Sequence, residues 1–276
     1  MLNIVSSLLF RLKKSKLFWI MLGVCFAVPV LSLALNEIIL EVAEIFIGST
    51  AGLGLEMVTY MSLTELVSLS STVCLFALLC VSIFLCKEYN DGTIRNTILS
   101  NKKRTDLYVA YAIVALIIGG SYLVAYFVST MLALGIPFGF GSATPAEVIT
   151  SCACSLLLGL LSLVFVISCV LMFMFATGKQ ASALIFPLLI TLFLPGIITT
   201  VVDVAALVIE MIKVGSENAF IDWSNAAFSW IPLYNAMLFD ASDVDGALVG
   251  KISMYYVAFS GLFVWLGLRA SKKDLK

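Results

Sequence analysis

The sequence predicts an all-α integral membrane protein with six membrane-spanning helices. Of its 276 residues, 62% are hydrophobic and only 12% are charged, whereas about a quarter of the residues of a soluble domain are charged. The mean hydropathy is correspondingly high, at +1.11. A helix needs about 20 apolar residues to cross the hydrocarbon core of a bilayer, and the chain contains six uncharged stretches of roughly this length. We therefore expect residues 1–276 to form a single transmembrane domain.

The first element that the sequence predicts is an amphipathic helix over residues 2–17. Apolar residues such as Ile4, Leu8 and Leu12 recur at helical spacing. The cations of this segment are Arg11, Lys13, Lys14 and Lys16. A basic amphipathic helix lies in the plane of the membrane surface, with its cations at anionic headgroups. We expect plain membrane anchoring or, in addition, contact with a partner protein.

The first span follows over residues 17–36. It is longer than the apolar core of a secretory signal, so we expect it to be retained. Glu37, Glu41 and Glu44 come directly after it, and their spacing places them on one face of a continuing helix. This acidic face is either simply solvated or forms an external vestibule that attracts a cationic cargo.

The other five spans are predicted from the remaining apolar stretches. A long uncharged stretch that begins at residue 107 is broken in its second half by glycine and proline, so we expect one span there and then an external turn. An Asp-rich segment just before the last span resembles a calcium loop only superficially, and helix capping is preferred. The five predicted spans cover residues 66–86, 107–134, 148–176, 181–202 and 248–269.

The distribution of charge predicts the orientation of the chain. Basic residues in short loops resist translocation across the membrane. Six spans place 14 of the 16 Lys and Arg residues on alternate loops and leave only Lys213 and Lys251 on the other side. The sequence therefore predicts a multi-pass membrane protein with both termini in the cytoplasm.

Several kinds of site are excluded by composition. The chain has no His, so no mechanism can use imidazole as a base or metal ligand. The seven Cys lie in or beside apolar runs, where we expect them to pack rather than to form disulfides or hold a metal. The net charge of −1 offers no excess of cations for nucleic acid. We expect no cofactor in this chain.

The sequence also lacks its own source of energy. Gly178-Lys179-Gln180 is the nearest approach to a phosphate-binding loop, but Gln180 replaces the Ser or Thr that holds Mg²⁺. The predicted spans carry no ionisable side chain for ion coupling, although Pro187 and Pro195 leave open a sodium site made of backbone carbonyls. We expect that the chain is not an enzyme and that any ATP is hydrolysed by a separate polypeptide.

The loop between the second and third spans is polar and locally structured. Asp91-Gly92 forms a turn pair, Thr93 can cap a helix, and apolar residues up to Leu99 then form one edge of a short surface helix. Such a loop is often only a positively charged connector.

At these residues the chain resembles the permease subunits of ABC-2-type transporters, in which this stretch forms the main coupling helix. The residues that carry the resemblance are Glu88, Gly92, Thr93, Arg95 and Leu99. The number of spans and the orientation fit the same family, and the resemblance implies a bacterial plasma membrane. The chain departs from it at Tyr111, where many relatives have Lys.

The resemblance implies that the chain forms a translocation path as a homodimer or heterodimer with a second permease. Cytoplasmic ABC ATPase subunits, which bind ATP and Mg²⁺, would drive it. Glu88 and Arg95 would be the main charged contacts with the ATPase, with Asn96 beside them, while Gly178 and Lys179 would form a smaller contact. Short external helices would precede the last span.

The cargo cannot be read from the sequence, although a charge-poor path suits a peptide, drug or other amphipathic molecule. Two other functions stay open. The chain could be a membrane immunity protein that binds an antimicrobial peptide without pumping it, or a secondary transporter or channel.

Overall fold

The structure is a computed structural model that describes residues 2–47, 63–90, 104–135, 145–177, 180–193 and 246–271, together with residues 197, 200, 201, 204 and 205. Within these residues every position except Ser15 is helical, so the all-α prediction is confirmed for the part of the chain that is described. The elements are α1 (Leu2–Lys14), α2 (Lys16–Ile47), α3 (Leu63–Asn90), α5 (Arg104–Thr130), the π-helix η2 (Met131–Gly135), α7 (Pro145–Thr177), α8 (Gln180–Leu188), the π-helix η3 (Leu189–Phe193) and α12 (Gly246–Ser271).

Several of these helices are suited to a membrane. Among the described residues, the segments Thr105–Ala133, Val148–Thr177 and Val249–Ser271 are each long and apolar enough to cross one, and the bent pair Asn3–Lys14 and Lys16–Ser32 makes a fourth if it is counted as one span. This is consistent with a multi-pass membrane protein. Helices α2 and α3 cover the predicted spans 17–36 and 66–86, and α8 with η3 covers residues 181–193 of the span predicted for 181–202. Neither α3 nor α8 is among these candidates. Six spans therefore remain a prediction.

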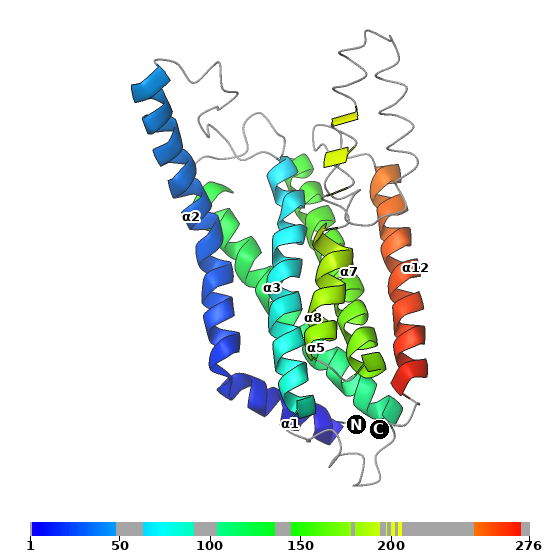
Figure 1. Ribbon diagram of the computed structural model, residues 1–276. Helices are drawn as coiled ribbons and strands as arrows, with labels where there is room; N and C mark the ends of the chain where they lie inside the picture. Colours follow the sequence, from blue (N-terminus) through cyan, green and yellow to red (C-terminus); the bar gives the residue numbers. More distant parts are fainter. Residues whose placement is uncertain are drawn as a thin grey trace.

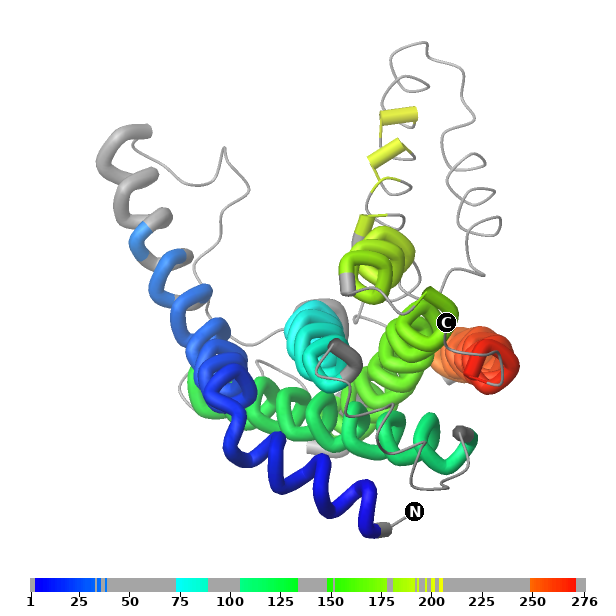
Figure 2. The backbone as a smooth tube through the Cα atoms, turned by 60° about the horizontal axis from the view of Figure 1, so that its bottom comes forward, coloured from blue at the N-terminus to red at the C-terminus, as the bar shows by residue number. Residues whose placement is uncertain are grey.

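Helix α7 is the centre of the bundle. It packs against α12, α3, α8 and α5, while α2 packs mainly against α5. Viewed from the end that carries α1, helix α5 crosses the molecule with α1 on one side and α3 and α7 on the other (Figure 2). Aromatic rings fill the contacts of α7: Phe165 lies 5.9 Å from Tyr256 of α12, and Phe175 lies 5.3 Å from Tyr108 of α5, measured between ring centroids.

Pro29 lies inside α2 and Pro187 lies inside α8, and near each proline a hydroxyl group of a neighbouring helix donates to a backbone carbonyl. Pro187 of α8 has no N–H to donate to the carbonyl of Ala183, and the Ser82 hydroxyl of α3 donates to that carbonyl instead, at 3.2 Å. Near Pro29 of α2, the Ser129 hydroxyl of α5 donates to the Phe26 carbonyl at 2.5 Å. These bonds join α3 to α8 and α2 to α5, and the one at Ala183 replaces the backbone donor that is missing at Pro187.

The chain bends sharply between α1 and α2. The two helices meet at 67°, and Ser15 stands between them, its N–H donating to the Leu12 carbonyl at 2.9 Å. The indole N–H of Trp19 donates to the Lys13 carbonyl at 2.9 Å across the bend. We call this turn, residues 14–17, the elbow. It lays α1 across one end of the bundle, as Figure 1 shows.

Most of the basic residues at the described helix ends lie at this end of the bundle. The C-terminal ends of α3, α7 and α12 and the N-terminal ends of α5 and α8 lie there with α1 (Figure 1). Lys87 lies in the last turn of α3, and Arg269 lies in the last turn of α12. Lys251 lies near the start of α12, towards the opposite end.

Candidate functional site

The site is built where α1 and the elbow approach the end of α3. Helix α1 turns Leu8 and Leu12, both buried, towards the bundle. Arg11 follows Leu8 by three positions and therefore lies on the same side of the helix. Its guanidinium reaches Glu88 in the last turn of α3, where Nη1 donates to Oε2 at 2.5 Å. Arg11 and Glu88 are 77 residues apart in the sequence, so this contact joins two helices that are not neighbours along the chain.

The two partners of the ion pair differ in exposure. The Glu88 side chain is 10% exposed and that of Arg11 is 45% exposed. A carboxylate taken out of water needs a compensating charge or hydrogen-bond donor, and the guanidinium supplies both. The pair therefore fixes the position of α1 relative to α3 more than an exposed surface pair would.

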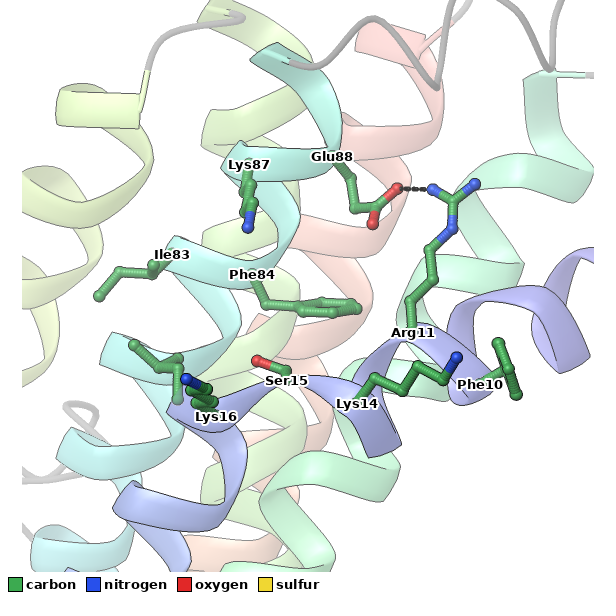
Figure 3. Close-up of a pocket in the computed structure, with 10 residues that line it drawn as sticks. Phe10, Arg11, Lys14, Ser15, Lys16, Ile83, Phe84, Lys87 and Glu88 are labelled. Carbon is green, nitrogen blue, oxygen red and sulfur yellow. Dashed lines mark hydrogen bonds and ion pairs between the residues drawn. The ribbon is translucent and has the colours of Figure 1, made fainter.

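Beside this pair lies a pocket of about 760 Å³. Its cationic lining comes from Arg11, Lys14, Lys16 and Lys87, and Glu88 is the single acidic residue among the lining residues described. Phe10, Leu17, Ile83 and Phe84 supply apolar surface. In Figure 3, Phe84 projects from α3 towards Arg11, and Lys87 points from α3 towards the elbow.

The cations of the pocket are held in different ways. Arg11 is engaged by Glu88. The Lys14 ammonium lies 4.4 Å from the centre of the Phe10 ring, a cation–π distance. The pocket is therefore strongly positive, with one cation partly neutralised by Glu88 and the lysines facing a mixed polar and apolar space. Such a space suits an anion that also has an apolar part.

The structure places some of the sequence-predicted site residues and leaves others undescribed. Arg11, Lys14 and Lys16 line the pocket, whereas the exposed Lys13 is not part of its lining. Glu88 belongs to the end of α3 rather than to the loop after it. Gly92, Thr93, Arg95, Asn96 and Leu99, and likewise Gly178 and Lys179, lie outside the described residues.

The predicted acidic face is only partly described. Glu37, Glu41 and Glu44 belong to α2, which continues beyond the first predicted span to Ile47, as their spacing predicted. Their side chains are not described. The short helices predicted before the last span fall between residues 206 and 245, outside the described part of the chain.

The sequence analysis missed the pairing of Arg11 with Glu88 and the contribution of α3 to the pocket. One local signal was available for Arg11, which sits on the same face of its helix as Leu8 and Leu12. A cation on the apolar side of an amphipathic helix indicates an acidic partner in the body of the protein. Nothing comparable singles out Phe84 or Ile83, which look like ordinary residues of an apolar span.

Comparison with known proteins adds no relative to these observations. No protein-family model, curated protein or solved structure matches the chain. The likeness to ABC-2-type permeases therefore rests on the residues from Glu88 to Leu99 and on the predicted arrangement of spans.

Proposed function

We propose that this chain is the permease subunit of an ATP-driven exporter of the ABC-2 type, worked by separate ATPase subunits on the cytoplasmic side. The observation that carries the proposal is the Arg11–Glu88 ion pair. It ties the amphipathic α1 to the end of α3, immediately before the segment that resembles a coupling helix. Movement of that segment would then be passed to α1 and α3 together.

Two features of the described residues support an energy source outside the chain. The helices α5, α7 and α12 form an apolar body whose candidate spans contain few charged residues. All the basic residues of the described helix ends except Lys251 lie at the end that carries α1. An excess of Lys and Arg is typical of the cytoplasmic side of a membrane protein, which is where an ATPase would dock.

The ion pair changes the role that we assign to Glu88. A carboxylate that is 10% exposed and held by Arg11 has little surface left for a partner protein. We therefore assign Glu88 to the link between α1 and α3, and we keep Arg95 as the charged contact with the ATPase. A second permease copy, or a homologous chain, completes the path in this proposal.

The test is to isolate the tagged full chain from its native membrane and to identify the proteins that come with it. We expect a nucleotide-hydrolysing subunit, and transport of cargo by the isolated complex in vesicles when ATP is added. Cargo binding without any such subunit would favour a non-pumping immunity protein and would contradict the proposal.

Variants of the same complex separate docking from coupling. Arg95→Ala should remove the ATPase from the isolated complex, whereas Glu88→Gln should leave it bound and lower the amount of cargo moved per ATP. Asp106→Asn, at the start of α5, is the matched control and should change neither. Equal behaviour of Glu88→Gln and Asp106→Asn would contradict the coupling role of the ion pair.

A further inference from the structure

The pocket at the elbow brings together two kinds of surface that the sequence keeps apart. Lys14 and Lys16 come from the chain on either side of Ser15, and Lys87 comes from α3. Arg11 is paired with Glu88, and these three lysines supply the other cations of the lining. The remaining lining is apolar and consists of Phe10, Leu17, Ile83 and Phe84.

The apolar surface continues beyond the pocket. Phe10 is 60% exposed on α1, and Ile20, one turn past the elbow on α2, is 64% exposed. Exposed apolar side chains on a helix suited to a membrane face lipid chains. The elbow therefore lies where a cationic pocket meets a surface for acyl chains.

We propose that this pocket binds the headgroup of an anionic phospholipid. The phosphate lies among the ammonium groups of Lys14, Lys16 and Lys87, and the glycerol and first methylene groups lie against Phe84 and Leu17. A phosphate group is the shared chemistry of a lipid and of a soluble phosphate ester, but only the lipid uses the apolar wall. A volume of about 760 Å³ falls within the range of about 300–1,000 Å³ that small-molecule sites occupy.

This inference is more specific than general attraction of a basic helix to a negative surface. General attraction would use every exposed cation of α1 equally. Binding in the pocket instead depends on Lys87, which belongs to α3 and not to the amphipathic helix. It does not depend on Lys13, which is exposed on α1 but does not line the pocket. Lys13 is therefore the matched control for Lys14, with the same charge on the same helix.

The experiment measures lipid retention by native mass spectrometry of the purified full chain, released from nanodiscs of phosphatidylcholine that contain phosphatidylglycerol. We expect preferential retention of phosphatidylglycerol. Lys14→Gln and Lys87→Gln should each weaken it about fivefold, from the contribution of about 1 kcal/mol per cation. Lys13→Gln should leave it unchanged, and Lys87→Arg, which keeps the charge, should bind nearly as well as the original chain.

Three results would overturn the proposal. The first is equal retention of phosphatidylglycerol and phosphatidylcholine, and the second is a loss with Lys13→Gln as large as that with Lys14→Gln. The third is competition by millimolar glycerol phosphate or inorganic phosphate, which would make the pocket a site for a soluble phosphate. Unfolding of each variant in pure phosphatidylcholine, expected at the original midpoint, excludes loss of fold as the cause. No ATPase takes part, so the outcome is independent of the proposed function.

Discussion

Arg11 and Glu88 illustrate how two residues of opposite charge can set the relation between two helices. Their contact joins Nη1 and Oε2 at 2.5 Å, with the carboxylate nearly buried. The energetic value of such a pair depends on what remains when one partner is removed. Exposed pairs contribute about 0–1 kcal/mol to the free energy of unfolding. Breaking a buried pair costs about 3–5 kcal/mol, because the remaining charge is buried without a partner.

Exchange of the two charges tests this pair. Arg11→Glu and Glu88→Arg, made singly, should each lower the free energy of unfolding by about 2 kcal/mol, between the values for exposed and buried pairs. The double variant should recover at least about half of the combined loss because the opposite charges face each other again. Lys13→Glu makes the same charge change at an exposed position of α1 and should have little effect. Unfolding in bicelles measures all four, and simple addition of the two single effects would show that the pair is not energetically coupled.

At the scale of helices, the bundle depends on close approach and on hydroxyl bonds between neighbours. Gly267 of α12 lies so near α5 that a Cβ there would come within 2.6 Å of the Tyr108 hydroxyl oxygen. The Tyr108 ring is buried against Phe175, so it has little room to move. Absence of a side chain at Gly267 is thus a requirement of the contact between α12 and α5.

Substitution of Gly267 tests that contact. Gly267→Ala should destabilise the fold by about 1–3 kcal/mol, the usual cost of an overpacked interior. Gly261→Ala in the same helix is the control, because a Cβ there meets nothing within 4 Å among the described residues. It should be neutral or should stabilise the helix by up to about 1 kcal/mol. Thermal unfolding midpoints compare the two, and equal midpoints would contradict the packing.

The hydroxyl bond between α3 and α8 allows a double-mutant cycle. Ser82→Ala should cost about 1 kcal/mol, since the Ala183 carbonyl loses the donor that replaces the N–H missing at Pro187. In the background of Pro187→Ala that cost should fall towards zero, because the new N–H at position 187 can bond the same carbonyl. Ser253→Ala, whose hydroxyl bonds only within α12 at Val249, is the control. Equal costs of Ser82→Ala in both backgrounds would contradict the explanation.

The sequence predicted the positions of the helices better than their ends and irregularities. Each predicted span begins within a helix, and α2 continues to Ile47, as the spacing of Glu37, Glu41 and Glu44 predicted. For the span predicted over residues 181–202, α8 and η3 cover residues 181–193. The π-helices after Thr130 and Leu188 were not predicted. Thr130, directly before the first π-helix, donates its hydroxyl to the Tyr126 carbonyl at 2.9 Å. Pro187, which lacks an N–H, lies two residues before the second.

The sequence singled out some of the residues of the candidate site, but not its apolar lining, Lys87 or its geometry. Arg11, Lys14, Lys16 and Glu88 were all selected from the sequence, yet for different roles and in separate places. Their meeting depends on the 67° bend at Ser15 and on packing between helices far apart in the chain. Local spacing carries no information on such contacts, so the pocket required the tertiary structure.

The whole molecule combines an apolar body with a charged end. The described spans leave large apolar side chains exposed, as expected where lipid or a second copy covers them. The charged end gathers α1, the elbow and the last turn of α3, immediately before the loop that resembles a coupling helix. This arrangement places all the proposed work of an external ATPase at one end of the bundle.

The most direct test of this account places a photo-cross-linking amino acid at position 95 of the full chain in its native membrane. The account predicts a cross-linked product with a nucleotide-hydrolysing protein, formed on the cytoplasmic side and altered by ATP, and no such product from position 251 near the start of α12. Labelling of position 95 from outside the cell, or transport of cargo without any ATP-hydrolysing partner at this position, would contradict it.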